Sequence, residues 1–223
     1  MGFEPPARLS RGSHPSLSHE RIPSFIADLR AREAIAARAL EFLILTNVRT
    51  DAVLKACWDD FDLDDALWTV PVANLKDRKY RKEGFRVPLP PRTGKIVREM
   101  ESIRTSDYVF PGQAPVKPLS NMALLTLLKR MNSVAGEKWV DVVDGRPITA
   151  HGFRATFRTW AEEVTGFPHA VIEEAMGHQL GNQVERVYRR TDVLEKRRQL
   201  MEAWARYCEP DNRSNAVEKS AKA

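Results

Sequence analysis

The chain has 223 residues, a length sufficient for one good-sized core or two small ones. Of these residues 43% are hydrophobic and 29% are charged, which fits a globular protein. Lys and Arg outnumber Asp and Glu by 35 to 30, and this basic excess permits a polyanionic partner without requiring one. Two widely separated cysteines with no metal-ligand spacing indicate a reducing compartment. No apolar run approaches the ~20 residues of a membrane span and no signal-peptide core opens the chain, so we expect a cytoplasmic protein with no membrane partner.

The N-terminal part is expected to hold a tail followed by three helices. Residues 1–17 are rich in Pro, Gly, Ser and Arg and predict a tail or linker. Ser18 is a candidate N-cap for a helix that ends near Ala31. The Ala- and Leu-rich residues 32–47 predict a buried helix, and Thr50 could cap a short helix that ends near Trp58.

A small sheet is expected after the acidic residues 59–65. Residues 66–74 and 84–90 are β-like runs on either side of the charged stretch LKDRKYRKEG, which predicts a hairpin with a basic tip. A helix over about residues 92–103 follows, and DYVFPG predicts a short strand and turn at residues 107–112.

Helical patterns dominate the rest of the chain. We expect a helix capped by Ser120, a loop over residues 134–147, and a helix after Thr149 that Gly166 and Pro168 end. A helix that ends at Gly177, a short helix over residues 184–188 and a last helix capped by Asp192 are expected to follow. The fold class is therefore mainly α with a small antiparallel β-sheet (α+β). We expect one domain over residues 18–208 and a disordered polar tail over residues 209–223.

Candidate functional residues begin with a His-x-x-Arg pair. His151 and Arg154 lie three residues apart, on one face of a predicted helix, and Arg158 adds a cation one turn further on. By itself this pair is more often a satisfied histidine beside a surface arginine. The neighbouring aromatic stripe is expected in the core; it comprises Phe153, Phe157 and Trp160.

A second group of polar residues follows. His178 stands directly after Gly177 at a predicted helix end, and Tyr188 comes ten residues later. A lone Tyr on a helix is usually a half-buried packing residue. Here Arg189 and Arg190 follow it directly, which is an unusual setting for a core tyrosine.

These residue types suit the transfer of a DNA strand. Negative charge develops on the nonbridging oxygens when a phosphodiester is attacked, and fixed arginines there lower the barrier. A tyrosine hydroxyl can attack phosphorus and store the bond as a phosphotyrosine, while His and Lys move protons. This chemistry requires no metal or other cofactor, and no carboxylate cluster suited to Mg²⁺ is evident in the sequence.

The order Arg, Lys, His-x-x-Arg, Gly-His, Tyr resembles that of the tyrosine recombinase (phage integrase) family. The stretches ITAHGFRATFRTWAEE, EEAMGH, VYRR and RRQLMEAWARYC are similar to P4-type prophage integrases. The resemblance covers roughly residues 18–208, and its motifs are specific as an ordered set although each is weak alone. It implies a tyrosine recombinase catalytic-domain fold. It also implies an integrase that cleaves and rejoins DNA through a 3′-phosphotyrosine.

The family's phosphate-binding positions match two arginines and one histidine. The resemblance implies that Arg49 and Arg154 hold the scissile phosphate and that His178 donates a hydrogen bond to a nonbridging oxygen. Separately, Arg49 could merely cap a helix end, and His178 could cap the carbonyls of its own helix.

Three further positions carry the nucleophile and the proton transfers. The resemblance implies that Tyr188 is the nucleophile and that His151 assists proton movement at the tyrosine. Lys76 best matches the family's hairpin lysine, the general acid, although Lys79 and Lys82 also lie close. Lysines in such a charged run are commonly just solvated.

Two positions depart from the family pattern, and one segment is absent. Ala52 stands where the family usually has a supporting Glu, and Phe85 stands where related integrases often have a His. Residues 1–17 stand where the family carries an N-terminal helical domain that clasps DNA, and losing half the clamp would weaken binding and steepen its salt dependence. The alternative is therefore a truncated, non-catalytic DNA-binding remnant.

The implied partners are double-stranded DNA with attachment-type sites and other protomers in a synaptic tetramer. Accessory DNA-bending proteins are a further expectation, and DNA binding would place the protein at the nucleoid. A relaxing enzyme similar to type IB topoisomerases would share the same residues. The last helix, with an apolar side of Leu194, Leu200, Met201 and Trp204, could dock in its own domain or in a neighbour's, which leaves open whether Tyr188 acts in cis or in trans.

Overall fold

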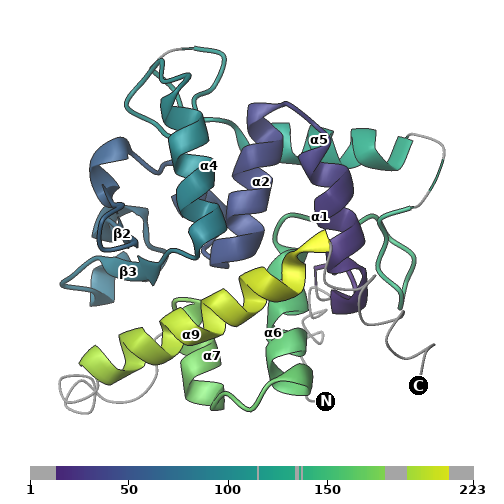
Figure 1. The fold of residues 1–223 in the computed structure, drawn as a ribbon. Coiled ribbons are helices and arrows are strands. Elements are labelled where there is room, and N and C mark those ends of the chain that lie inside the picture. The colour runs from purple at the N-terminus through teal and green to yellow at the C-terminus, as the bar shows by residue number, and fades with distance from the viewer. Residues whose placement is uncertain (1–13, 115, 134–135, 137, 179–189, 211–223) are drawn as a thin grey trace, which may run out of the picture.

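A computed structural model describes residues 14–114, 116–133, 136, 138–178 and 190–210. These residues form a mainly helical fold with one small antiparallel sheet, which confirms the predicted fold class. The last helix, α9 (Arg190–Cys208), runs diagonally across the molecule in Figure 1. No helix within these ranges is long and apolar enough to cross a membrane.

The N-terminal helices form close to where the sequence predicts them. A 3-10 turn (His19–Arg21) leads into α1 (Ile22–Arg30), and α2 (Ile35–Thr46) is buried along most of its length and contacts both α1 and α9. Ser18 precedes the turn but makes no side-chain capping hydrogen bond, so its predicted role was wrong. The backbone of the turn supplies the first bonds instead, because the N–H of Arg21 donates to the oxygen of Ser18 at 3.0 Å.

Helix α3 (Thr50–Leu54) is shorter than predicted, and its N-cap residue is Arg49. Thr50 is the first helical residue, not the cap. The chain after Lys55 leaves the helix for a 3-10 turn (Trp58–Asp60), which the Asp60 carboxylate stabilises by accepting a hydrogen bond from the N–H of Cys57 at 2.9 Å.

The sheet has three antiparallel strands in the order β1-β2-β3. Their bounds are β1 Phe61–Asp62, β2 Leu67–Val70 and β3 Phe85–Pro88. Trp68 of β2 lies opposite Val87 of β3, and both side chains are buried. The charged loop between β2 and β3 confirms the predicted hairpin with a basic tip. This loop contains two 3-10 turns, Val72–Asn74 and Arg78–Tyr80.

The remaining helices are α4 Pro91–Glu101, α5 Asn121–Ser133, α6 Gly152–Val164 and α7 His169–Ala175. The stretch DYVFPG makes only isolated bridges, Cys57 with Tyr108 and Pro111 with Pro118, so the strand predicted there was wrong. Helix α9 begins at Arg190, two residues before the cap predicted at Asp192. The short helix predicted at residues 184–188 lies outside the described residues.

The core is one continuous cluster of buried apolar side chains. Phe153, Phe157 and Trp160 of α6 are buried in it, as predicted. The indole N–H of Trp204 on α9 donates to the main-chain oxygen of Ile44 on α2 at 2.8 Å. Helix α9 therefore docks on the helices of its own chain. Its buried side includes Leu200 and Met201, whereas Leu194 is only half-buried.

A buried ion cluster on α2 ties several helices together. The Glu41 side chain is completely buried, and its carboxylate accepts hydrogen bonds from Arg30 of α1 and Arg92 of α4, both at 2.7 Å. Arg38 approaches the same carboxylate at 3.3 Å. Because three arginines converge on one carboxylate, Glu41 fixes how α1 and α4 lie against α2.

Candidate active site

The junction between α2 and α3 positions Arg49. Asn47 is the C-cap residue of α2, and its φ of 53° lies in the left-handed region and stops the helix. Arg49 follows in extended conformation and is half-buried. Its guanidinium has no hydrogen-bonding or ion-pair partner within the described part of the chain, so its charge is available to an anion.

Arg154, in the first turn of α6, is almost completely buried. Its guanidinium donates to the main-chain oxygens of Asn47 and Met176, the latter at 2.7 Å. Burial, and then the charge of Arg49, lower the pKa of Arg154 to about 10. The two guanidinium groups repel each other, so an anion bound between them would relieve that repulsion.

His178 extends this arrangement at the end of α7. Nη2 of Arg154 lies 3.2 Å from Nε2 of His178, and Nδ1 of the same ring lies 2.6 Å from a carboxylate oxygen of Glu173. An arginine can only donate, so Nε2 is the acceptor and the ring proton sits on Nδ1. Burial by itself raises the pKa of the Glu173 carboxyl, but the hydrogen bond from His178 and the charge of Arg158 hold the pKa below its usual value.

His151 is the N-cap residue of α6 and is exposed. Partial burial by its neighbours lowers the pKa of its imidazole, and the charges of His14, Arg154, Arg49 and Lys76 lower the pKa further. The ring is therefore biased toward its neutral form, in which a nitrogen can accept a proton.

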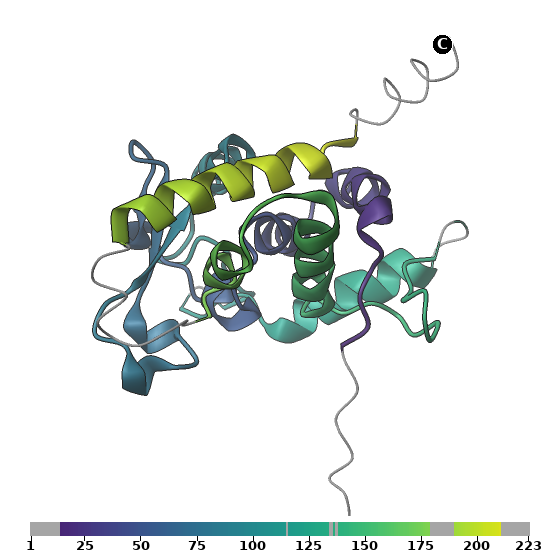
Figure 2. The same ribbon diagram turned by 90° about the horizontal axis from the view of Figure 1, so that it is seen from below.

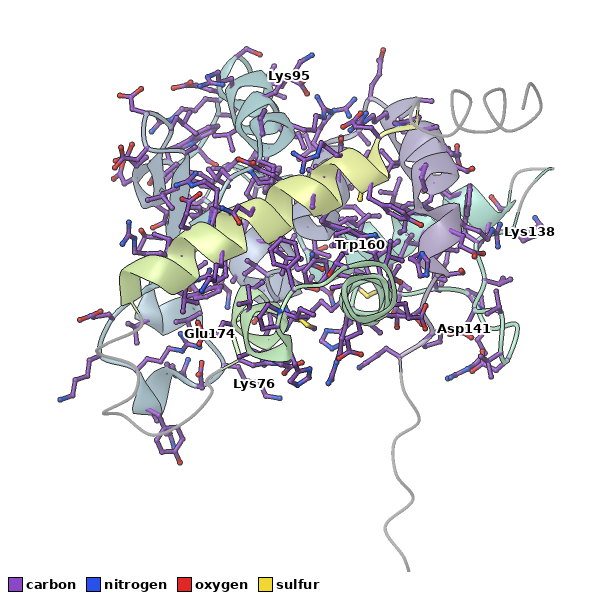
Figure 3. All side chains as sticks on the ribbon, turned by 60° about the horizontal axis from the view of Figure 1, so that its bottom comes forward. Lys76, Lys95, Lys138, Asp141, Trp160 and Glu174 are labelled. Atoms are coloured by element: carbon purple, nitrogen blue, oxygen red, sulfur yellow. The ribbon has the colours of Figure 1, made fainter. Side chains whose placement is uncertain are left out.

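Lys76, labelled in Figure 3, is exposed on the loop between β2 and β3. It lines a basic hollow together with Arg49. The hollow has a volume of about 460 Å³. Of the other two candidate lysines, Lys79 lines this hollow and Lys82 does not. Its basic and aromatic lining comprises Arg49, Lys55, Lys76, Arg78, Lys79 and Tyr80.

The structure thus brings five of the six predicted site residues together. Arg49 and Lys76 share the hollow, Arg154 contacts His178, and the charges of Arg49, Lys76 and Arg154 all act on His151. Tyr188, the sixth, lies outside the described residues. The described residues include no group of three or more His, Cys, Asp or Glu side chains arranged to hold a metal ion.

The two departures from the family pattern lie beside each other under the hairpin. Ala52 and Phe85 line one small pocket with Gly177. Two arginines lie over the Phe85 ring, with the guanidinium carbons of Arg81 and Arg197 at 5.6 Å and 4.6 Å from its centre. Phe85 therefore contributes an aromatic surface where a histidine would contribute ring nitrogens.

The same two arginines fasten the hairpin to its neighbours. Arg81 donates to the main-chain oxygen of Gly177 at 2.7 Å, and the buried Arg197 of α9 donates to that of Arg86. Burial, followed by the charges of Arg81 and Arg86, lowers the pKa of Arg197 to about 10, against the opposing charge of Glu174. These contacts hold the hairpin that carries Lys76 against α7 and α9.

Sequence reasoning missed Glu173 and this arginine pair. The signal for Glu173 was present, since an acid five residues before a histidine at a helix end can fold back onto its ring. Arg81 and Arg197 are separated by more than a hundred residues, so no local pattern could pair them. Arg158, predicted as a further site cation, instead pairs with Glu162 at 3.1 Å and with Glu173 at 3.4 Å.

Comparison with known sequences decides the family. The Phage integrase family matches residues 15–195, which is most of the chain. The chain belongs to the phage integrase family. Prophage integrase IntA of Escherichia coli K12 is 28% identical to this integrase-family chain over 207 residues, covering 91% of this chain and 46% of IntA. The integrase of Enterobacteria phage P4 is also 28% identical, covering 87% of this chain and 45% of the phage protein.

These relatives confirm the resemblance to P4-type prophage integrases. The chain spans about half the length of the curated relatives it matches. Solved structures of the phage integrase family share the fold. The integrase of mycobacterium phage Brujita has a TM-score of 0.62 at 20% identity, covering 94% of this chain and 63% of that one. The Tn1549 transposon integrase, solved with a circular intermediate DNA, has a TM-score of 0.60 at 13% identity, covering 96% and 67%. At these identities the likeness confirms the tyrosine recombinase catalytic-domain fold.

Proposed function

We propose that this chain is the strand-cleaving and strand-joining part of a site-specific DNA recombinase that works through a 3′-phosphotyrosine at Tyr188. The observation that carries the proposal is the placement of Arg49 beside the buried Arg154, with Lys76 and His151 next to them. Two like charges held close together suit an oxyanion such as a phosphate. Membership of the phage integrase family supports the same conclusion.

In the proposed cleavage step the phenol oxygen of Tyr188 attacks the scissile phosphorus, and the bond from phosphorus to the 5′ oxygen breaks. His151 accepts the phenol proton, and Lys76 gives a proton to the departing 5′ oxygen. Joining is the reverse reaction with a new 5′ hydroxyl, so the phosphotyrosine conserves the bond. The charges of Arg49 and Arg154 stabilise the nonbridging oxygens in both steps.

His178 can contact the phosphate only after its own hydrogen bonds change. In the DNA-free geometry its Nε2 accepts a hydrogen bond from Arg154. Donation from Nε2 to a phosphate oxygen therefore requires a second ring proton, with Nδ1 still bonded to Glu173. We propose that Arg154 turns its Nη2 toward the phosphate when DNA binds, and that Nε2 of His178 then takes up a proton from solvent, which it donates to a phosphate oxygen.

We further propose that the reaction needs no metal ion and that it involves the following partners. The proposed substrate is duplex DNA with attachment-type sites, and other protomers would join it in a synaptic complex. A tetramer of λ integrase has been solved on a Holliday junction, and its fold is similar to this chain with a TM-score of 0.53 at 12% identity. Accessory DNA-bending proteins and a nucleoid location are part of the same proposal.

A covalent-adduct assay on randomised DNA tests the proposal whatever the target sequence is. The chain is incubated, with EDTA present, with a pool of nicked duplexes of randomised sequence, in which the cleaved strand diffuses away and traps the adduct. We expect an adduct that survives denaturing electrophoresis, and sequencing the captured DNA then identifies the site. Tyr188→Phe should abolish the adduct and leave DNA binding intact.

Other outcomes contradict the proposal. DNA binding with no adduct would indicate the non-catalytic remnant. Relaxation of supercoiled plasmid with no site preference would indicate the topoisomerase-like activity. An adduct that persists in Tyr188→Phe would contradict the assigned nucleophile.

A further inference from the structure

Residues 14–17, here called the strap, run beside the start of α6 (Figure 2). The N–H of Thr149 donates to the main-chain oxygen of Pro15 at 3.2 Å, and the hydroxyl of Thr156 donates to that of Leu17 at 2.6 Å. The Leu17 side chain is buried in the core. The strap is therefore fixed to α6 by backbone and side-chain contacts, although the composition of residues 1–17 predicted a tail.

Two further features hold the strap in place. The carboxylate of Asp141, which is labelled in Figure 3, accepts a hydrogen bond from the N–H of Ser16 at 2.7 Å. This bond is the main reason that the pKa of Asp141 lies below its usual value. Gly152 permits the close approach, because a Cβ on it would lie 2.0 Å from the oxygen of Pro15.

At the start of the strap, His14 contacts His151. The two ring centres are 4.4 Å apart with an interplanar angle of 63°, so one ring lies edge-on to the other. We propose that the strap is part of the active site and that His14 is a positioning residue, which fixes the His151 ring beside Arg49, Lys76 and Arg154. This inference rests on the proposed function, in which His151 accepts the proton of the nucleophile.

The charges around His151 explain what His14 does to it. Four groups act on the ring: His14 from the strap, Arg154 from α6, Arg49 from the start of α3, and Lys76 from the hairpin loop. All of them disfavour the imidazolium. His14 is the only one of these four groups that also makes a ring contact with His151. Removing His14 should therefore raise the pKa of the His151 imidazole toward its ordinary value.

NMR titration of the histidine ring resonances tests this step with no DNA present. In His14→Ala we expect the His151 titration to move to higher pH than in the wild type. His14→Phe keeps the ring contact and removes the charge, so its shift should be smaller. Asp141→Asn retains both histidine side chains but weakens the anchor of the strap, so the ring contact should loosen and give a partial shift in the same direction.

The matched control is His19→Gln, which removes another histidine close by in the chain. His19 contacts Tyr207 and Glu163, away from the active site, so this variant should leave the His151 titration unchanged. Circular dichroism and thermal unfolding check that each variant folds. An identical His151 titration in wild type and His14→Ala would overturn the proposal, and so would an equal shift in His19→Gln.

The rate of adduct formation supplies a second readout. If only neutral His151 accepts the tyrosine proton, the acid limb of the pH profile should move to higher pH in His14→Ala, with little change in alkaline solution. A merely structural role would lower the rate equally at every pH, and that result would overturn the positioning role. Failure of the wild type to form any adduct would refute the proposed function alone, because the NMR titration still decides whether the strap acts on His151.

Discussion

Glu173 accepts a hydrogen bond from Nδ1 of His178 at 2.6 Å, and the other nitrogen of that ring lies 3.2 Å from Arg154. Two hydrogen bonds in series thus fix both the tautomer and the orientation of His178. Glu173 was not among the predicted site residues, yet its buried carboxylate orients His178 and, through that ring, Arg154.

The first prediction concerns Glu173→Gln. The amide keeps the size of the side chain but loses the negative charge that holds the Nδ1 proton of His178. Losing a hydrogen bond to a charged group is worth about 1.5–3 kcal/mol, so we expect adduct formation to slow by roughly tenfold to a hundredfold. Single-turnover rates on the captured DNA site measure the effect.

A double-mutant comparison separates this role from general destabilisation. In a His178→Ala background, Glu173→Gln should cause little further loss, because the residue it positions is already absent. Equal losses in the two backgrounds would show that Glu173 does not act through His178.

The second prediction concerns anion binding by Arg49 and Arg154. Burial and the neighbouring Arg49 lower the pKa of Arg154, so an oxyanion that binds both guanidinium groups should stabilise the folded chain. Inorganic phosphate should raise the unfolding temperature by about 2–4 °C for each kcal/mol of binding free energy. Differential scanning fluorimetry at constant ionic strength measures this rise.

Arg49→Met should remove most of the phosphate-specific rise. Arg104→Met is the matched control, because Arg104 is an exposed arginine that packs over Trp58, on a different part of the surface. It should leave the rise unchanged. Equal loss in both variants would mean that phosphate acts through general charge, with no specific site.

The third prediction concerns the buried Glu41 cluster. Burial raises the pKa of Glu41, but the hydrogen bonds and charges of Arg92 and Arg30 outweigh it, so the pKa lies below its usual value. Glu41→Gln removes the buried carboxylate from two half-buried arginines, each of which keeps a second carboxylate partner, Glu209 for Arg30 and Glu99 for Arg92. The loss of hydrogen bonds to a charged group should lower the free energy of unfolding by about 1.5–3 kcal/mol at neutral pH. Urea unfolding measures the difference, and Glu163→Gln, an exposed partner of His19, should change it by less than about 1 kcal/mol.

The same cluster predicts a pH dependence. Since the folded-state pKa of Glu41 is depressed, its contribution is present above the unfolded-state pKa and is lost as pH falls through the folded-state value. The stability difference between wild type and Glu41→Gln should therefore shrink in acid. A difference that stays constant or grows as pH falls would contradict this assignment.

The fourth prediction concerns which protomer's tyrosine is used. Tyr188 stands two residues before Arg190, where α9 begins, and α9 docks on α7, α2 and β3 of its own chain. We therefore expect Tyr188 to attack a phosphate held by its own Arg154. A mixture of Tyr188→Phe and Arg154→Ala proteins should form no adduct, whereas adduct in the mixture would show attack in trans.

The elements with strong periodicity were predictable from sequence. The buried α2, the hairpin with a basic tip and the aromatic stripe of α6 all follow from the spacing of apolar residues. Helix boundaries were harder to predict from the sequence. Asp192 was predicted as a cap, but it lies inside α9, which includes Arg190. The preference of Asp for N-cap positions is a tendency that a helix can extend past.

The candidate site was predictable as an ordered set of residues, although each motif is weak alone. His151 and Arg154 stand in a His-x-x-Arg pair, and Arg49 was identified through the resemblance to the phage integrase family. Their supports could not be read in this way. Glu173 contacts His178 because the chain turns back at the end of α7. His14 contacts His151 because the strap runs beside the start of α6.

The most direct test of the central claim is to map the covalent bond. Adduct from the captured DNA site is digested with a nuclease and with a protease that cleaves after glutamate, and the peptides are analysed by mass spectrometry. The account predicts a nucleotide attached through phosphate to Tyr188, in the peptide of residues 186–195. A nucleotide on any other residue, or bound DNA with no modified peptide at all, would contradict it.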